Sequence, residues 1–301
     1  PSYKTIRDFT LPEDRKPDSQ VMLSHQKCNN GNPIIEAYME QDYTVPGDFS
    51  LYVYESQILA GEIQRYAVEH FRRHIGLCMG VITWQLNDCW PAVSWAGLDY
   101  YGRWKAQQYY TKRFYAPILI SAKDEGTKID LWVNNDTLND IKGTVDWKLM
   151  DKQSKIVEED SVPVEVGSCQ AIEAVTLDFS GRVADPSERY VEFAFTMNGE
   201  TASSGTALFV KPKDFHFADP QISLDVAEEE SQFIVTLKSA AFAKSVALDL
   251  KEADCVFSDN YFDLSANREK TVTAEKAGLS RKLTSDEFTR QLTVQSVFDI
   301  K

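Results

Sequence analysis

The stretch that decides the fold is Met79–Asp88, which reads MGVITWQLND. Small and β-branched apolar residues run up to Trp84, and an amide and a carboxylate, Asn87 and Asp88, follow soon after. A run that is apolar on both faces is typical of a strand inside a parallel barrel, which is covered on both sides. We therefore predict a buried strand over Leu77–Trp84, with a flat aromatic ring where it ends. A ring so placed, with polar groups just beyond it, is suited to the floor of a sugar-binding site.

Helical patterns flank this strand. Asp48 or Ser50 can cap a long helix in which apolar residues recur three or four positions apart and form one buried stripe. Three glutamates seven apart on this helix, Glu55, Glu62 and Glu69, are expected on its solvated outer face. The predicted helices cover Tyr3–Thr10, Gln20–Lys27, Pro33–Gln41, Asp48 or Ser50 to about His74, and Trp104–Tyr115. Helix, buried strand, loop and helix make the final βα unit of a β/α barrel.

From about residue 117 the pattern changes to short alternating runs separated by turns, which is typical of half-buried strands. One set, including Ile129–Val133 and Val191–Phe195, predicts an antiparallel sandwich of immunoglobulin-like plan. A linker over Lys211–Pro220 precedes a second set, including Phe233–Leu237, which predicts another small sandwich. The predicted fold class is multidomain α+β: a C-terminal part of a (β/α)8 barrel at 1–116, an immunoglobulin-like sandwich at 117–212 and a C-terminal β-sandwich at 213–301.

The residues after the strand carry a family resemblance. DCWPAVSWAGLDYYGRWKAQQYYTKRFYAP (Asp88–Pro117) resembles the end of the catalytic barrel of the β-mannosidases of glycoside hydrolase family 2. That family typically reads WQLND-x-W, then S-W, then Y-x-G-x-W-K and F-A-P, and these pieces occur here in the same order, the last as FYAP. CVFSDNYFDL (Cys255–Leu264) is similar to the C-terminal sandwich of the same enzymes. The resemblance implies hydrolysis of terminal β-linked mannose with retention.

Five residues are candidates for the site. Trp84 is expected to stack on the apolar face of a pyranose, the alternative being a core tryptophan. Asn87 and Asp88 either hydrogen-bond sugar hydroxyls or make a turn and cap the next segment. His25 matches a histidine that the family often has after barrel strand 7, the alternative being a helix-surface residue. Asp99 is either a turn residue or a cleft residue.

Catalysis needs residues that this sequence lacks. Retaining glycosidases use two carboxylates roughly 5–5.5 Å apart. The resemblance implies a nucleophile in an S-E-[YF]-G segment at the end of strand 7, and no such segment occurs here. We expect the nucleophile a few residues before Pro1 and the acid/base farther upstream. The 301 residues are thus expected to be inactive without the N-terminal domains of the same protein.

Composition limits the classes of partner and cofactor that are expected. The net charge is −14, and residues 117–301, with 20 basic and 33 acidic side chains, carry most of it. An acidic surface repels phosphate backbones, so nucleic acid is not an expected partner. No apolar stretch has transmembrane length, so membrane insertion is not expected. His70 and His74 stand four apart without an HExxH pattern, and no glycine-rich phosphate loop occurs, so no metal and no cofactor are expected. The five scattered cysteines are expected to be buried free thiols.

Two alternatives remain open. One is another family 2 glycosidase of the β-galactosidase or β-glucuronidase type, which shares the architecture but lacks the WQLND-x-W loop in this form. The other is a non-catalytic chain whose two sandwiches bind carbohydrate or proteins. The strand-end tryptophan disfavours the second alternative, because a pure binding module has no need of it.

Overall fold

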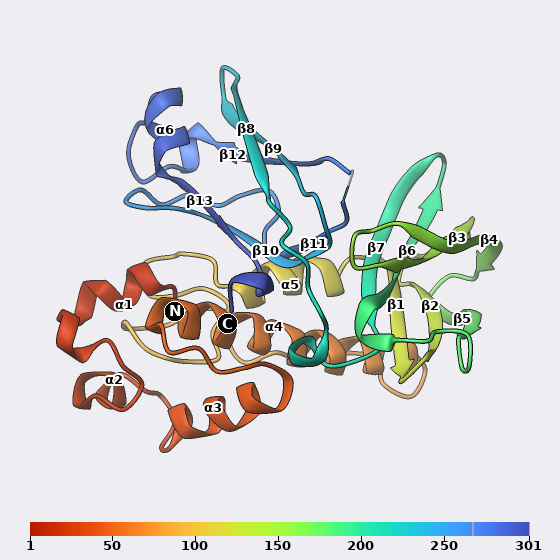
Figure 1. Ribbon diagram of the computed structural model, residues 1–301, viewed down its shortest axis with the longest axis horizontal. Helices are drawn as coiled ribbons and strands as arrows, with labels where there is room; N and C mark the ends of the chain where they lie inside the picture. The colour runs from red at the N-terminus through yellow and green to blue at the C-terminus, as the bar shows by residue number, and fades with distance from the viewer. Residues whose placement is uncertain (267, 301) are drawn as a thin grey trace. The chain divides into compact units, whose positions relative to one another are not determined.

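The computed structural model describes residues 1–266 and 268–300. The chain forms two compact units. Unit 1 comprises Pro1–Glu62, Thr83–Tyr110 and Asp219–Lys301, and unit 2 comprises Ile63–Ile82 and Thr111–Ala218. Helices dominate the first third of the chain and strands follow (Figure 1). The domain boundaries drawn from the sequence at 116 and 212 stay predictions.

The predicted helices are confirmed, with small shifts at their ends. Side-chain caps fix where they begin: Ser19 Oγ accepts a hydrogen bond from the Met22 amide at 3.1 Å, and Asp48 Oδ1 accepts from the Leu51 amide at 3.0 Å. Gly76, at φ +100°, follows the longest helix in the left-handed conformation that glycine adopts most easily. The helices are α1 (Tyr3–Phe9), α2 (Gln20–Ser24), α3 (Gly31–Asp42), α4 (Phe49–Arg73) and α5 (Ala106–Phe114).

The predicted strand over Leu77–Trp84 is wrong for this structure, in which the described residues form no strand there. Leu77 is 89% exposed and Ile82 is 96% exposed, so the run is bare where the sequence predicts burial. The physical reason is that a parallel strand exists only through hydrogen bonds to neighbouring strands on both sides. Among the residues that the structure describes, no strand is paired with this run.

Helix α4 follows the predicted stripe in its first half only. Tyr54, Ile58 and Leu59 are buried as expected, whereas Ile63, Tyr66 and Phe71 are exposed. The expectation that the three glutamates face solvent is also wrong. Glu55 and Glu69 are buried, and Glu62 is half-buried and accepts a hydrogen bond from the Tyr110 hydroxyl at 3.0 Å. Spacing of seven places side chains on one helix face but does not say which face meets protein.

Unit 2 contains the middle sandwich, formed by strands β1 to β7. Two antiparallel sheets, in the orders β1-β2-β5 and β4-β3-β6-β7, enclose a core in which Trp147 packs edge-to-face on Phe179 at 5.9 Å between ring centroids. The strands are β1 (Ile118–Glu125), β2 (Lys128–Asn135), β3 (Ile141–Asp151), β4 (Ile156–Val166), β5 (Gln170–Asp178), β6 (Arg189–Met197) and β7 (Glu200–Leu208). The sequence predicts strands at Ile129–Val133, Val145–Leu149, Val191–Phe195 and Ala207–Val210, which fall in β2, β3, β6 and the end of β7. It gives no strand for β1, β5 or the largely exposed edge strand β4.

Unit 1 contains the C-terminal sandwich, formed by strands β8 to β13. Its antiparallel sheets, β12-β9-β8 and β11-β10-β13, share a core in which Phe233 stacks on Phe288 at 4.3 Å. Helix α6 (Ser285–Gln291), capped by Thr284, contributes Phe288. The strands are β8 (Ser223–Glu228), β9 (Gln232–Lys238), β10 (Ala243–Leu250), β11 (Phe262–Leu264), β12 (Lys270–Glu275) and β13 (Leu292–Gln295).

Within unit 1 the C-terminal sandwich packs on the helical segment. The Tyr54 hydroxyl of α4 donates to the Ser245 carbonyl at 2.6 Å, and the Phe257 amide donates to the Tyr109 hydroxyl of α5 at 3.2 Å. Lys4 of α1 donates to the Ala253 carbonyl at 2.7 Å. Three elements of the helical segment therefore bind one sandwich, which gives unit 1 a continuous interior.

Two further expectations can be compared with the structure. None of the helices among the described residues combines the length and apolar character needed to cross a membrane. All five cysteines are free, but the expectation that they are buried is wrong, because Cys28, Cys89 and Cys169 are exposed and the other two are half-buried. Each exposed cysteine lies in a loop or turn, where neighbouring chain does not cover a short side chain.

Candidate functional site

The loop Gln85–Lys105, which follows Trp84, folds back on itself through backbone hydrogen bonds. The Gly97 amide donates to the Gln85 carbonyl at 3.0 Å, and the Leu98 amide donates to the Leu86 carbonyl at 2.8 Å. The Asp88 amide returns a bond to the Leu98 carbonyl at 3.2 Å. These bonds make a parallel bridge between Asn87 and Leu98. The residues just after Trp84 are therefore held by the second half of the same loop.

A buried ion pair fixes the centre of this loop. The Asp88 carboxylate lies 3.0 Å from Lys105 Nζ, and the Ser94 hydroxyl donates to its other oxygen at 2.6 Å. Lys105 Nζ also donates to Ser94 Oγ at 3.2 Å, which closes a triangle of polar groups. Burial lowers the pKa of Lys105, and the nearby Asp88 carboxylate opposes that shift. Such a pair is costly to break, because either partner left alone is an uncompensated buried charge.

Asp99 is a turn residue in this structure. Its Oδ1 accepts hydrogen bonds from the Tyr101 amide at 2.9 Å and the Arg103 amide at 3.0 Å. Its Oδ2 accepts from the Thr5 hydroxyl, which in turn accepts from Arg103 at 2.8 Å. Asp99 thus shapes the AGLDYYG turn and ties it to the first helix. Of the two sequence hypotheses for this residue, the turn is the one confirmed.

His25 lies between two aromatic rings. Its imidazole stacks on Phe9 at 4.1 Å between ring centroids and on Trp90 at 4.6 Å. Nδ1 donates to the Pro91 carbonyl, with 2.6 Å between the two atoms, because a carbonyl oxygen only accepts. Nε2 is the ring nitrogen that this hydrogen bond leaves unused. His25 joins the end of α2 to the Gln85–Lys105 loop, and its contact with substrate stays a prediction.

The two other predicted site residues lie at the loop entry and are open to solvent. Trp84 is 69% exposed, so it is not a core tryptophan among the described residues. Asn87 is exposed, and its side-chain amide donates only a long bond, 3.4 Å, to the Asp88 carbonyl. Asp88, by contrast, is buried with both oxygens engaged. Substrate contact by Trp84, Asn87 and Asp88 stays a prediction for all three.

Sequence reasoning missed the partners that position these residues. Lys105 and Ser94 hold Asp88, and Phe9 and Trp90 hold His25. One clue for Lys105 was available: with Arg103 it is one of two cations in the aromatic-rich YYGRWK segment, where a buried charge needs a carboxylate partner. Ser94 and Phe9 carried no comparable clue, because serine and phenylalanine occur in many loops and helices without such roles.

The carboxylates of this loop are not available as a catalytic pair. Asp88 is paired with Lys105, and Asp99 accepts backbone and hydroxyl hydrogen bonds. A retaining glycosidase needs one carboxylate to attack and one to transfer a proton. Within the described part of the chain, this loop therefore offers a surface for binding rather than the acid/base chemistry.

One cluster of possible metal ligands lies in the middle sandwich. Asp185, Glu188 and His216 place ligand atoms within 4.8 Å of one another, and they are the group of this kind found among the described residues. Asp185 accepts a hydrogen bond from the Ser187 hydroxyl at 2.6 Å, and Glu188 forms an ion pair with Lys152. Protein donors thus already engage both carboxylates.

Each of the two sandwiches matches a known domain family. Residues 127–214 match the family described as the mannosidase Ig/CBM-like domain, and residues 217–300 match the Ig-fold domain family of mannosidases. These two matches cover the strands of the middle sandwich from β2 onward and all strands of the C-terminal sandwich.

Whole proteins align over nearly the full chain. β-Mannosidase B of Aspergillus clavatus is 26% identical over 301 aligned residues, which cover 91% of this chain and 35% of that protein. β-Mannosidase A of Neosartorya fischeri is 25% identical and covers 100% of this chain and 36% of its own length. The chain thus spans about a third of the length of these curated relatives.

The solved structure of β-D-mannosidase from Dictyoglomus thermophilum superimposes with a TM-score of 0.88. It is 23% identical, and the match covers 98% of this chain and 36% of that one, which shows a shared fold. The two sandwich domains therefore match immunoglobulin-type domain families of mannosidases, and the chain as a whole is similar to the C-terminal part of the β-mannosidases of glycoside hydrolase family 2.

Proposed function

We propose that this chain is the C-terminal portion of a retaining exo-β-mannosidase, which removes terminal non-reducing β-D-mannose from an oligosaccharide or glycoconjugate. The observation that carries the proposal is the setting of Trp84. Its ring is 69% exposed at the entry of a loop that a buried ion pair holds in shape. An exposed flat ring on a rigid support stacks well on the apolar face of a pyranose.

Each of the neighbouring site residues would make a different contribution to sugar binding. Asn87, which is exposed and follows Trp84 in the same loop, would hydrogen-bond a sugar hydroxyl. Asp88 would act through Lys105 as a positioning residue for the loop, and direct contact with sugar would require it to exchange a partner. His25 would offer Nε2 while its other nitrogen stays bound to the Pro91 carbonyl.

The catalytic glutamates would lie outside these 301 residues. Two facts support this placement: the loop carboxylates are engaged by protein groups, and the chain spans about a third of its relatives. The parent protein would then be a glycoside hydrolase, and residues 1–301 alone would be inactive. The N-terminal domains of the same protein would be the partner that completes the barrel.

The test compares the intact protein with residues 1–301 on p-nitrophenyl β-mannoside. We expect hydrolysis by the intact protein only. In the intact protein, Trp84→Ala should lower kcat/KM by about 100-fold, because both stacking area and positioning are lost. Trp84→Phe, which keeps a ring, should lose about tenfold or less. Trp95→Ala, another tryptophan of the same loop, serves as the matched control and should change kcat/KM by no more than about twofold.

The same assay separates the alternatives. Faster hydrolysis of a β-galactoside or β-glucuronide would establish the other family 2 activity in place of the mannosidase. No hydrolysis of any of these glycosides by the intact protein would favour the non-catalytic binding protein. Turnover of the mannoside by residues 1–301 alone would overturn the placement of the glutamates.

A further inference from the structure

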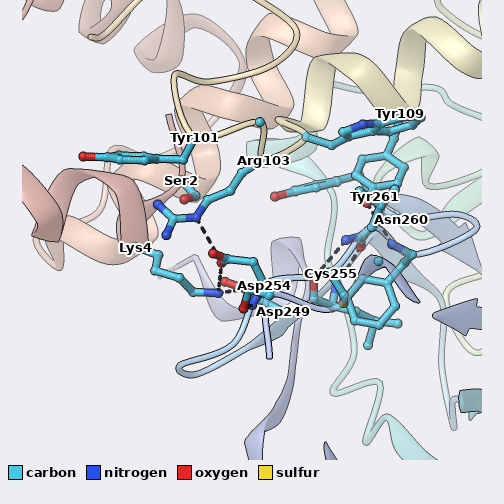
Figure 2. A pocket seen from close by; sticks show the side chains of 17 residues that line it. Ser2, Lys4, Tyr101, Arg103, Tyr109, Asp249, Asp254, Cys255, Asn260 and Tyr261 are labelled. Carbon is cyan, nitrogen blue, oxygen red and sulfur yellow. Dashed lines mark hydrogen bonds and ion pairs between the residues drawn. The ribbon is translucent and has the colours of Figure 1, made fainter. Parts of the chain in front are cut away.

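A cavity of about 240 Å³ lies within unit 1, between the helical segment and the C-terminal sandwich (Figure 2). The helical segment lines it with the start of α1 and the turn Tyr101–Trp104. The C-terminal sandwich lines it with the end of β10 and the segment Asp254–Tyr261. Trp84, Asn87, Asp88 and His25 are not among its lining residues. The cavity is thus a separate feature from the loop entry.

One end of the cavity is ionic, and its cations and carboxylates are paired, with Asp8 outside the lining as a further partner of Arg103 at 2.9 Å. Lys4 Nζ lies 3.1 Å from Asp249 and 2.9 Å from Asp254, and Arg103 Nε lies 3.0 Å from Asp254 (Figure 2). Two cations thus face two carboxylates. Burial opposes ionisation of Asp254, but hydrogen bonds from Arg103 and Lys4 outweigh it and lower the pKa of that carboxyl. A ligand with a net charge would have to displace one of these pairs, whereas neutral hydroxyls can bond to them as they stand.

The rest of the cavity is aromatic. Trp104 lies 5.1 Å from Tyr109 and Tyr109 lies 5.9 Å from Tyr261, measured between ring centroids. Tyr101 lies toward the ionic end, with the Arg103 guanidinium 4.9 Å from its ring centroid, and its side chain is 47% exposed. These rings come from both sides of the cavity, so a flat ligand would meet aromatic surface on more than one face.

The aromatic end is also held in place. Asn260 accepts a hydrogen bond from the Leu248 amide at 2.8 Å and donates to the Leu248 carbonyl at 2.9 Å, which fixes the segment that carries Tyr261. The Tyr109 hydroxyl accepts from the Phe257 amide at 3.2 Å. The cavity walls are therefore set by hydrogen bonds before any ligand arrives, which reduces the entropy cost of binding.

We propose that this cavity binds one neutral sugar unit, with the apolar faces of the sugar on the aromatic rings and its hydroxyls at the ionic end. The volume falls below the 300–1,000 Å³ usual for drug-sized ligands, which suits a single ring rather than a chain. The paired charges select against sugar acids and amino sugars. This inference goes beyond the proposed function, because it requires no hydrolysis.

The experiment uses the intact protein and β-1,4-mannobiose. Crystals soaked in mannobiose should show one hexose unit in the cavity. In calorimetric titrations of the same sugar, Tyr101→Ala should weaken the binding event of the cavity about tenfold, because it removes the most exposed ring of the lining. Tyr100→Ala is the matched control: its ring is 51% exposed and adjacent in sequence, yet it does not line the cavity, so affinity should stay within about twofold.

Each outcome has a clear meaning. An empty cavity at saturating mannobiose, equal effects of the two tyrosine variants, or equally tight binding of glucuronate or glucosamine would overturn the proposal. Hydrolysis of p-nitrophenyl β-mannoside is measured in parallel, and Tyr101→Ala should leave kcat/KM within about twofold of the parent. A protein that hydrolyses no mannoside but still shows sugar in the cavity would contradict the proposed function and leave the cavity assignment standing.

Discussion

The segment Phe49–Trp84 and the loop Gln85–Lys105 are consecutive in sequence and both expose large apolar side chains, but they differ in whether a buried carboxylate has a partner. In the loop, the buried Asp88 has Lys105 as a partner at 3.0 Å. In the segment, Glu55 is 0% exposed, and neither carboxyl oxygen has a hydrogen-bond partner among the described residues. The segment also leaves large apolar side chains open to solvent, namely Ile63, Tyr66, Phe71, Leu77, Met79 and Ile82.

This difference separates a self-contained element from one that needs further protein. Unpaired buried polar groups and bare apolar side chains both cost free energy, and a segment that carries both is typical of a surface that another part of a protein covers. At the centre of the loop, by contrast, both oxygens of the buried Asp88 carboxylate have partners. We infer that the Asp88–Lys105 pair holds the centre of the loop, whereas Phe49–Trp84 presents a surface suited to cover by further protein.

The largest expected effect comes from breaking the ion pair of the loop. Asp88→Ala leaves Lys105 buried without its carboxylate, and removal of one partner of a buried pair costs about 3–5 kcal/mol of unfolding free energy. Urea unfolding of the intact protein measures this change. Hydrogen exchange at the Leu98 amide, which is bonded to the Leu86 carbonyl, reports whether the loss is local.

The control for this variant is an ion pair on the surface. Lys123 and Glu125 lie 2.7 Å apart on strand β1 with both side chains exposed, so Glu125→Ala should leave the unfolding midpoint unchanged. Replacing both members, Asp88→Leu with Lys105→Met, should recover part of the loss, because no lone charge is then buried. A change below about 1 kcal/mol for Asp88→Ala would show that the loop does not depend on this pair.

An effect that builds up gradually with pH is expected at Glu55. Burial raises the pKa of Glu55 to about 8, whereas a glutamate in an unfolded chain titrates near ~4.3. Between these values the folded state holds a proton that the unfolded state has released. The contribution of Glu55 to stability is therefore fully present below about pH 4.3 and is lost as pH rises toward 8, by at most about 1.4 kcal/mol for each pH unit.

Glu55→Gln tests this directly, since the amide has the same shape and does not titrate. The variant should be more stable than the parent at pH 8, and the difference should vanish as the pH falls to about 4. Thermal unfolding across this range is the measurement. Glu13→Gln, at an exposed glutamate, should follow the pH profile of the parent. Parallel profiles for Glu55→Gln and the parent would mean that Glu55 is charged when folded and has found a partner.

The comparison also shows what sequence could predict. The helices and most sandwich strands followed from periodicity and caps, because these depend on neighbouring residues: Asp48 caps α4, and Phe233–Leu237 alternate in β9. The motif around Trp84 gave the family resemblance for a different reason. It is recognised by the identity of many residues in order, and not by a periodic spacing of apolar residues.

The errors have a common physical cause. The state of Leu77–Trp84 depends on strands that would lie beside it, and the burial of Glu55 depends on what covers the face of α4 from which it projects. Neither partner is encoded in the local pattern, so an apolar run predicts burial and a glutamate predicts solvent. The same limit hid Ser94 and Phe9, whose partners Asp88 and His25 lie outside the local periodic pattern of each residue.

The smallest expected effect is at the exposed apolar run Leu77–Trp84. It tests whether this run needs cover from further protein, as the loop does not. Ile82 is 96% exposed, so Ile82→Asp in residues 1–301 should change the unfolding free energy by less than about 0.5 kcal/mol. Amides over Met79–Thr83 should exchange rapidly in the same chain, while the Leu98 amide stays protected. In the intact protein, where we propose that this run becomes a covered barrel strand, Ile82→Asp should bury an unpaired carboxylate and destabilise by several times more. Equal and negligible effects in both proteins would show that the run stays bare, and the completion of Phe49–Trp84 by further barrel residues would then be excluded.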